Sequence, residues 1–279
     1  MNWYVAAVAA AIFYAAQMLG LRRLQKHYPI TVYMAYVWLG AGAIIGLLFL
    51  RTTVALDPIT LVYVALGAVG SWAGMYGVNR AIGLQPNVGY VDAVGTLRLG
   101  LMYGASILMF GAVFEPLKLV ALAGGAVGVA LIVGLRRDPT ASADRRWVVW
   151  LLFSVVCFTV LFVCVRLATL RGLDARAATS LVMLIAGALY VAAAWRGGHS
   201  LRPAADWPMI VLTIAFSTVG NVAFFTSLVS APNLAYTDAV VNLRLIILYA
   251  AALITGADRL HPIRALGVAV TFGCAVLLG

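Results

Sequence analysis

The chain has 279 residues, of which 64% are hydrophobic and 10% are charged, and its mean hydropathy is +1.03. A soluble domain is about half apolar and about a quarter charged, so this composition excludes an ordinary water-soluble protein and indicates one embedded in a lipid bilayer. The net charge of +10 comes mostly from basic residues in short gaps between apolar runs, which favours a membrane protein and argues against a nucleic-acid partner.

Apolar runs close to the about 20 residues that span a bilayer recur along the whole chain. They predict an all-α polytopic protein with ten transmembrane helices, over residues 3–21, 31–50, 59–83, 87–110, 117–135, 147–170, 177–195, 207–229, 233–256 and 262–279. Positive residues follow the first run rather than precede it, so we expect a retained helix and not a signal peptide. Prolines mark most of the gaps, as at Tyr28-Pro29, Asp57-Pro58, Gln85-Pro86, Glu115-Pro116, Ala231-Pro232 and His261-Pro262.

An internal repeat is the strongest feature of the sequence. Residues 86–103 read PNVGYVDAVGTLRLGLMY and residues 232–249 read PNLAYTDAVVNLRLIILY, with ten of eighteen positions identical at a constant offset of 146. Apolar sequences match by chance at Leu, Val and Ala, but not at Pro, Asn, Asp, Arg and two Tyr together. The repeat predicts two five-helix halves, 1–135 and 147–279, joined by a polar linker at 136–146.

Five helices per half is an odd number, so the second copy is expected to cross the membrane in the opposite sense. This is an inverted-topology repeat with a pseudo-two-fold axis in the membrane plane, which is the architecture of many secondary transporters. Two inverted copies can exchange conformations, and that exchange turns an outward-open site into an inward-open one.

Few charged residues fall inside the predicted spans. Of the nine acidic residues, only Asp92 and Asp238 lie well inside spans, and these two are repeat mates. The basic residues inside spans are Arg80, Arg98, Arg166 and Arg244, of which Arg98 and Arg244 are again repeat mates. Ionisable groups at this depth are costly unless paired, hydrated or neutralised, and by default they mark a functional site.

On an ideal helix, Thr96 and Tyr103 share a face with Asp92, while Arg98 lies about 120° around the helix. In the second copy, Asn242 and Tyr249 share a face with Asp238. One interpretation is a midplane cavity in which these polar groups bind substrate or carry protons. The other is a pair of buried salt bridges between the halves, Asp92 to Arg244 and Asp238 to Arg98. The two interpretations are compatible, because a salt bridge that breaks on substrate binding serves both.

No catalytic motif or metal cluster is recognisable, and we expect neither an enzyme nor a cofactor-dependent protein. The three cysteines, Cys157, Cys164 and Cys274, lie inside apolar runs without disulfide or metal spacing.

The end of each half carries a recurring pattern. The first half has Gln85-Pro86-Asn87, then Phe114-Glu115-Pro116-Leu117-Lys118, then a glycine-rich helix with Gly124, Gly125 and Gly128. The second half has Ala231-Pro232-Asn233, then Gly256-Ala257-Asp258-Arg259-Leu260, then Gly267 and Gly273. With the ten-helix arrangement, this pattern resembles the EamA-type branch of the drug/metabolite transporter superfamily over the whole chain.

The resemblance implies a central cavity lined partly by the fourth and ninth helices, and alternating access of a small substrate. Family members often have a proline inside the fourth helix, where this chain has Arg98 and its mate Arg244. The resemblance also implies a cytoplasmic N-terminus. The charges indicate the reverse, because eleven basic residues follow odd-numbered spans and four follow even-numbered ones, which predicts that the odd loops are cytoplasmic.

The leading hypothesis is a secondary active transporter of a small polar or zwitterionic metabolite, amino-acid-like or another organic anion, coupled to protons or run as an exchanger. The arginines would bind a carboxylate or phosphate, and the aspartates would bind an amine or carry the proton. An exporter of cationic drugs and a lipid-linked-sugar flippase are the alternatives. We expect a multi-pass protein of a bacterial inner (plasma) membrane, as a monomer or homodimer.

Overall fold

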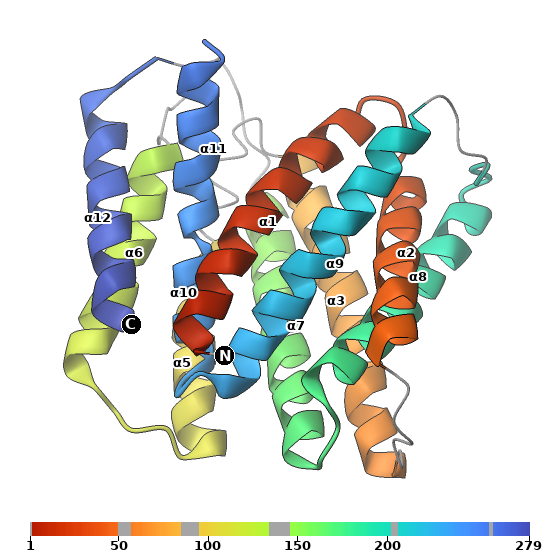
Figure 1. Cartoon of the computed structure of the whole chain (residues 1–279), viewed down its shortest axis with the longest axis horizontal. Coiled ribbons are helices and arrows are strands. Elements are labelled where there is room, and N and C mark those ends of the chain that lie inside the picture. Colours follow the sequence, from red (N-terminus) through yellow and green to blue (C-terminus); the bar gives the residue numbers. More distant parts are fainter. Residues whose placement is uncertain (1, 50–56, 85–94, 134–145, 202–205, 257–258) are drawn as a thin grey trace.

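A computed structural model describes residues 2–49, 57–84, 95–133, 146–201, 206–256 and 259–279 (Figure 1). Across these ranges every regular element is an α-helix. The helices are α1 (Trp3–Leu24), α2 (Ile30–Phe49), α3 (Pro58–Leu84), α5 (Arg98–Phe110), α6 (Pro116–Val133), α7 (Arg146–Leu170), α8 (Ala175–Arg196), α9 (Trp207–Ser230), α10 (Leu234–Val241), α11 (Leu243–Ile254) and α12 (Pro262–Leu278).

Prolines and capping side chains set the starts of these helices. Pro58, Pro116 and Pro262 are the first residues of α3, α6 and α12, because proline already has the helical φ and lacks an N–H that would have no partner there. The Asp174 carboxylate accepts from the Arg176 N–H at 2.8 Å and so caps α8. The helix starts predicted after the proline turns are therefore confirmed at these positions.

The helices have the length and composition of a multi-pass membrane protein. Within the part of the chain that the structure describes, 8 helical stretches are long and apolar enough to cross a bilayer, with α10 and α11 taken together as one. The helices α5 and α12 are apolar but shorter, with 13 and 17 residues. Large apolar side chains such as Leu108, Val120 and Ile254 are exposed on the outside, which is the surface that lipid would cover.

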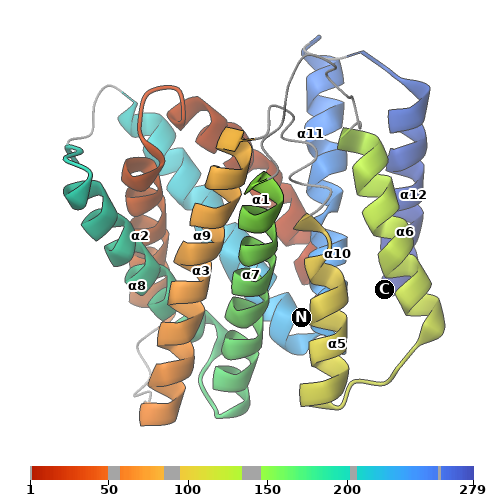
Figure 2. The same cartoon turned by 180° about the vertical axis from the view of Figure 1, so that it is seen from behind.

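The two predicted halves interlock. The most extensive contacts pair α1 with α9, α3 with α7, α2 with α8, and α6 with α12, and every pair joins one helix from each half. In Figure 1, α6, α11 and α12 lie on one side of the bundle and α2 and α8 on the other; Figure 2 shows α3 and α7 side by side from behind. Apart from Arg146, the predicted linker at 136–146 lies outside the described residues.

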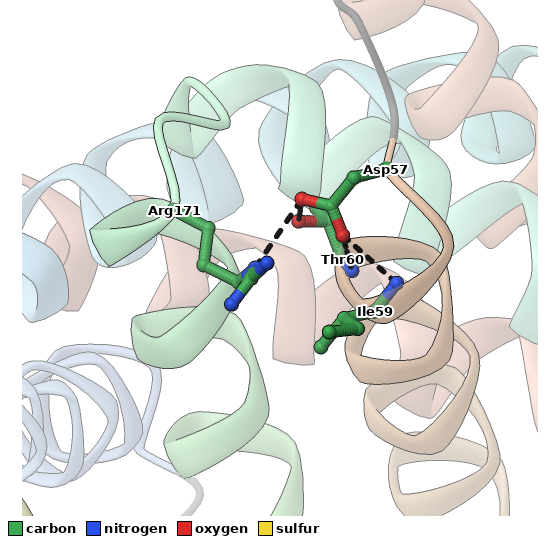
Figure 3. A network of polar contacts seen from close by, with 4 residues as sticks. All are labelled: Asp57, Ile59, Thr60 and Arg171. Carbon is green, nitrogen blue, oxygen red and sulfur yellow. Dashed lines mark hydrogen bonds and ion pairs between the residues drawn. The ribbon is translucent and has the colours of Figure 1, made fainter.

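The connection between α1 and α2 lies at the upper end of the bundle in Figure 1, and the connection between α7 and α8 lies at the lower end. A contact between polar side chains joins two helices at each of these ends. At the upper end His27 Nδ1 contacts Asp206 Oδ2, between the end of α1 and the start of α9. At the lower end Arg171 Nε donates to Asp57 Oδ2 at 3.2 Å, between the end of α7 and the start of α3 (Figure 3).

The span predicted at 233–256 is not one regular helix. It breaks at Asn242 into α10 and α11, and the Leu245 N–H bonds to the Asn242 carbonyl at 2.9 Å, three residues back instead of four. The span predicted at 87–110 shows the same feature at the repeat mate Thr96, whose carbonyl accepts from the Leu99 N–H at 2.9 Å before α5 begins. The earlier part of that span, 87–94, lies outside the described residues.

Candidate functional site

A buried ion pair joins the two halves beside these breaks. Arg98, the first residue of α5, donates from Nε to Asp238 Oδ2 at 2.6 Å and from Nη2 to Oδ1 at 2.8 Å. The side chain of Asp238 is 3% exposed and that of Arg98 is 18% exposed. The contact is bidentate and charge-assisted, which is the strongest form of a carboxylate–guanidinium pair. The Asp238–Arg98 pairing, one of the two interpretations of the repeat, is present in the structure.

Neighbouring groups fix both members of this pair. The helices α5 and α10 run antiparallel. Away from the ion pair, a second contact joins them, in which the Leu234 N–H at the start of α10 donates to Ser106 Oγ on α5 at 3.0 Å. The guanidinium carbon of Arg98 also lies 5.7 Å from the centre of the Phe158 ring on α7. Arg98 is therefore held between a carboxylate and an aromatic ring, and it contacts the second half of the chain on both sides.

A small cavity adjoins the pair. Four of the predicted site residues line it, Thr96, Arg98, Asn242 and Arg244. The rest of the described lining comes from Val78, Gly95, Val129, Leu151, Ser154, Val155, Phe158 and Leu245. The guanidinium groups of Arg98 and Arg244 thus line one small cavity together with three neutral polar side chains, those of Thr96, Asn242 and Ser154.

The helical-wheel analysis placed Arg98 on a different face from Thr96, but both line the same cavity. Thr96 lies in the irregular turn before α5, and Arg98 is the first residue of α5. In the second copy, Asn242 and Arg244 lie at the equivalent break between α10 and α11, and both also line the cavity.

Asp92, which pairs with Arg244 in the salt-bridge interpretation, lies outside the described residues. Its role as a second carboxylate of the site stays a prediction.

Tyr103 and Tyr249 were predicted to contribute phenols to the site. In the structure, their hydroxyls instead form hydrogen bonds with the main chain of loops. Tyr103 Oη accepts from the Glu115 N–H at 3.0 Å and donates to the Glu115 carbonyl at 3.2 Å. Tyr249 Oη accepts from the His261 N–H at 3.2 Å and donates to the Arg259 carbonyl at 3.4 Å. Because Glu115 and His261 are also mates at the offset of 146, the two phenols hold equivalent loops.

A polar network that the sequence analysis did not identify lies between α1 and α9. Tyr14 Oη donates to Asn221 Oδ1 at 3.0 Å, and both Asn221 Nδ2 and Gln17 Nε2 donate to Ser217 Oγ at 3.2 Å. Tyr14 is also close enough to Arg244, Asp238 and Arg98 to feel their charges, which places this network near the buried pair. The internal repeat does not identify these residues as polar sites, because their mates are apolar. The mates of Tyr14, Gln17 and Asn221 are Val160, Val163 and Met75.

The described residues contain no group of three or more His, Cys, Asp or Glu side chains placed to hold a metal ion. The three cysteines are free thiols in the structure.

No family model and no curated protein matches the chain. Solved structures do match it. The crystal structure of one protein aligns with a TM-score of 0.76 and 16% sequence identity, covering 99% of this chain and 96% of that chain. At this low identity the likeness shows a shared fold over nearly the whole length of both chains and carries no information on substrate.

Proposed function

We propose that this chain is a secondary active transporter of the drug/metabolite transporter type, which moves a small polar or zwitterionic metabolite with an anionic group by alternating access. The observation that carries the proposal is the Arg98–Asp238 pair, which is buried, joins the two halves and borders a cavity that also contains Arg244. Charged groups at this depth in a membrane bundle are retained where they bind or move a solute.

We further propose that the halves are inverted copies of five spans each, with α5 and α12 belonging to the fourth and tenth. The contacts between helices support this arrangement. The repeat relates α1 to α7 and α9 to α3, so the contact of α1 with α9 is equivalent to the contact of α7 with α3. The other two main contacts, α2–α8 and α6–α12, each join a helix to its own repeat mate. Exchange of conformation between the halves would then change the side of the membrane to which the Arg98–Asp238 pair is accessible.

The chemistry of the cavity favours an anionic group on the substrate. A carboxylate or phosphate that binds the Arg98 guanidinium competes with Asp238 for the same donors. Asp238 then loses its partner in a buried position, and uptake of a proton would neutralise it. Substrate binding and proton binding are thereby coupled through one arginine. A cationic drug is less well matched, because the Asp238 carboxylate that would attract it is already neutralised by Arg98.

Thermal stability of the purified protein against a metabolite library tests this function. A ligand that binds the folded state at about 100 times its Kd raises stability by about 2.7 kcal/mol. We expect anionic or zwitterionic compounds to raise the apparent Tm of the wild type and of Arg80→Ala, a control that removes an exposed span arginine. The same compounds should not raise the Tm of Arg98→Ala or Arg244→Gln. Stabilisation by cationic compounds alone, lost in Asp238→Asn, would instead support the drug exporter.

A further inference from the structure

Two buried polar side chains line the cavity without a hydrogen-bond partner in the part of the chain that the structure describes. They are Ser154 on α7 and Asn242 at the break between α10 and α11. Ser154 is 1% exposed and Asn242 is 5% exposed, so the bundle keeps both away from bulk solvent. A buried polar group without a partner is costly, and most such groups in proteins bond to protein, water or ligand. The partner of these two side chains is therefore a molecule inside the cavity.

Asn242 stands where an asparagine normally serves the fold. It is the N-cap residue of α11, and at that position the side-chain oxygen usually accepts a hydrogen bond from a main-chain N–H. Asn233 does so at the start of α10, accepting from the Ala235 N–H at 3.0 Å. The Asn242 side chain makes no capping bond. The break in the helix therefore does not use the Asn242 carboxamide, which has donors and an acceptor to offer to a ligand.

The size and charge of the cavity restrict this ligand. Its volume of about 50 Å³ has room for about three or four water-sized groups, because one water needs about 10–15 Å³. The guanidinium groups of Arg98 and Arg244 line it, and none of the described lining residues is acidic. A carboxylate matches guanidinium groups in charge and geometry. An ammonium group next to that carboxylate would be repelled by both arginines, whereas a hydroxyl would not.

We propose that the cavity binds the head of a 2-hydroxycarboxylate, and that Ser154 and Asn242 determine this specificity. The carboxylate binds the arginines, and the hydroxyl at carbon 2 bonds to the Ser154 hydroxyl and the Asn242 carboxamide. A hydroxyl donates and accepts, so it can satisfy both side chains at once. The three oxygens of this head group match the size of the cavity. This inference rests on the proposed transport function and narrows its substrate to hydroxylated organic anions, in preference to zwitterionic amino acids.

Three ligands that differ in one substituent test the specificity. Lactate, propanoate and alanine share a three-carbon carboxylate and carry a hydroxyl, a hydrogen and an ammonium group at carbon 2. The Kd of each follows from the rise in apparent Tm of the purified protein with ligand concentration. Ser154→Ala removes one hydrogen-bonding group from the cavity. Ser71→Ala is the matched control, because Ser71 is also fully buried and its hydroxyl also has no partner, but it lies outside the cavity lining.

We expect the wild type and Ser71→Ala to bind lactate about tenfold more tightly than propanoate or alanine, which is the contribution of one or two hydrogen bonds. In Ser154→Ala the Kd for lactate should rise about tenfold, to the level of propanoate, while the Kd for propanoate stays the same. Asn242→Ala is a second variant with the same expected result, and it removes no capping bond.

Equal Kd values for the three ligands in the wild type would overturn the specificity, as would a lactate preference that survives both Ser154→Ala and Asn242→Ala. Either outcome leaves the transport function standing, because other anionic metabolites can still stabilise the wild type through Arg98. Binding of none of the three ligands also overturns the specificity. The transport function fails only if the whole metabolite library leaves the apparent Tm unchanged.

Discussion

At the scale of single residues, Arg98 combines two kinds of contact that depend on charge. It bonds twice to a carboxylate whose side chain is 3% exposed, and it stacks near Phe158. Removing one partner of a buried pair leaves the other charge without compensation, whereas replacing both by apolar residues of similar size is often neutral. Stability and function can therefore be separated at this pair.

We expect Arg98→Met to lower the free energy of unfolding by about 3–5 kcal/mol, because Asp238 is then buried without a partner. The double variant Arg98→Met/Asp238→Leu should regain most of the wild-type stability and still show no stabilisation by anionic metabolites. Apparent Tm with and without ligand measures both effects. A double variant as unstable as Arg98→Met would show that the pair matters through something other than its charges.

The repeat allowed this pair to be predicted, since Arg98 and Asp238 each have a mate and pairing across the halves is the symmetric solution. The network of Tyr14, Gln17 and Asn221 was not predictable in the same way. Their mates are Val160, Val163 and Met75, so they are lone polar residues in apolar runs, and sequence alone does not say what a lone polar residue faces.

At the scale of elements, helix starts and helix breaks differ in how well the sequence determines them. A start at Pro58 or Pro262 is a local matter of backbone geometry and was predicted correctly. The break at Asn242 lies inside an apolar span of adequate length, where hydropathy gives no sign of it. Thr96 and Asn242 are poor helix formers at mated positions, and they are the sequence signal that corresponds to the break.

The start of α3 makes a prediction about pH. Hydrogen bonds from the Thr60 N–H and hydroxyl to Asp57, together with Arg171, lower the pKa of the Asp57 carboxyl from 3.8 to about 2 (Figure 3). Because the folded-state pKa lies below the ordinary value, the ionised carboxylate stabilises the fold fully above about pH 4, and this contribution is lost as the pH falls through about 2.

Asp57→Asn keeps a capping side chain but cannot ionise. We expect the difference in apparent Tm between wild type and Asp57→Asn to be constant above about pH 4 and to shrink as the pH approaches about 2. Thermal unfolding in detergent over this range measures it. Arg171→Gln serves as a control with a small effect, because exposed ion pairs contribute little. A difference that does not change with pH would contradict the role given to the carboxylate.

At the scale of the whole molecule, the proposed inverted arrangement predicts on which side of the membrane each loop lies. The loops after α1 and after α7 lie at opposite ends of the bundle (Figure 1). Lys26 and Arg176 are exposed residues in and beside these loops. In a cysteine-free background, Arg176→Cys should react with a membrane-impermeant thiol reagent added to intact cells, and Lys26→Cys only after the cells are permeabilised, because the loops after odd-numbered spans are the basic ones.

Labelling of both positions from the same side would contradict the inverted repeat. The opposite order, with Lys26→Cys labelled in intact cells, would keep the inverted repeat and place the N-terminus in the cytoplasm, as the family resemblance implies. The experiment therefore decides between the charge distribution and the resemblance.

The two tyrosine-bound loops have a consequence for how the halves diverge after duplication. Each phenol bonds to the main chain of its loop, at Glu115 in the first copy and at Arg259 and His261 in the second. Because these bonds are made to main-chain atoms, they do not require one side chain at the mated position, which is Glu115 in one copy and His261 in the other. The two copies therefore share Tyr103 and Tyr249, while the loops that these residues hold carry different side chains and lie at opposite ends of the bundle (Figure 1).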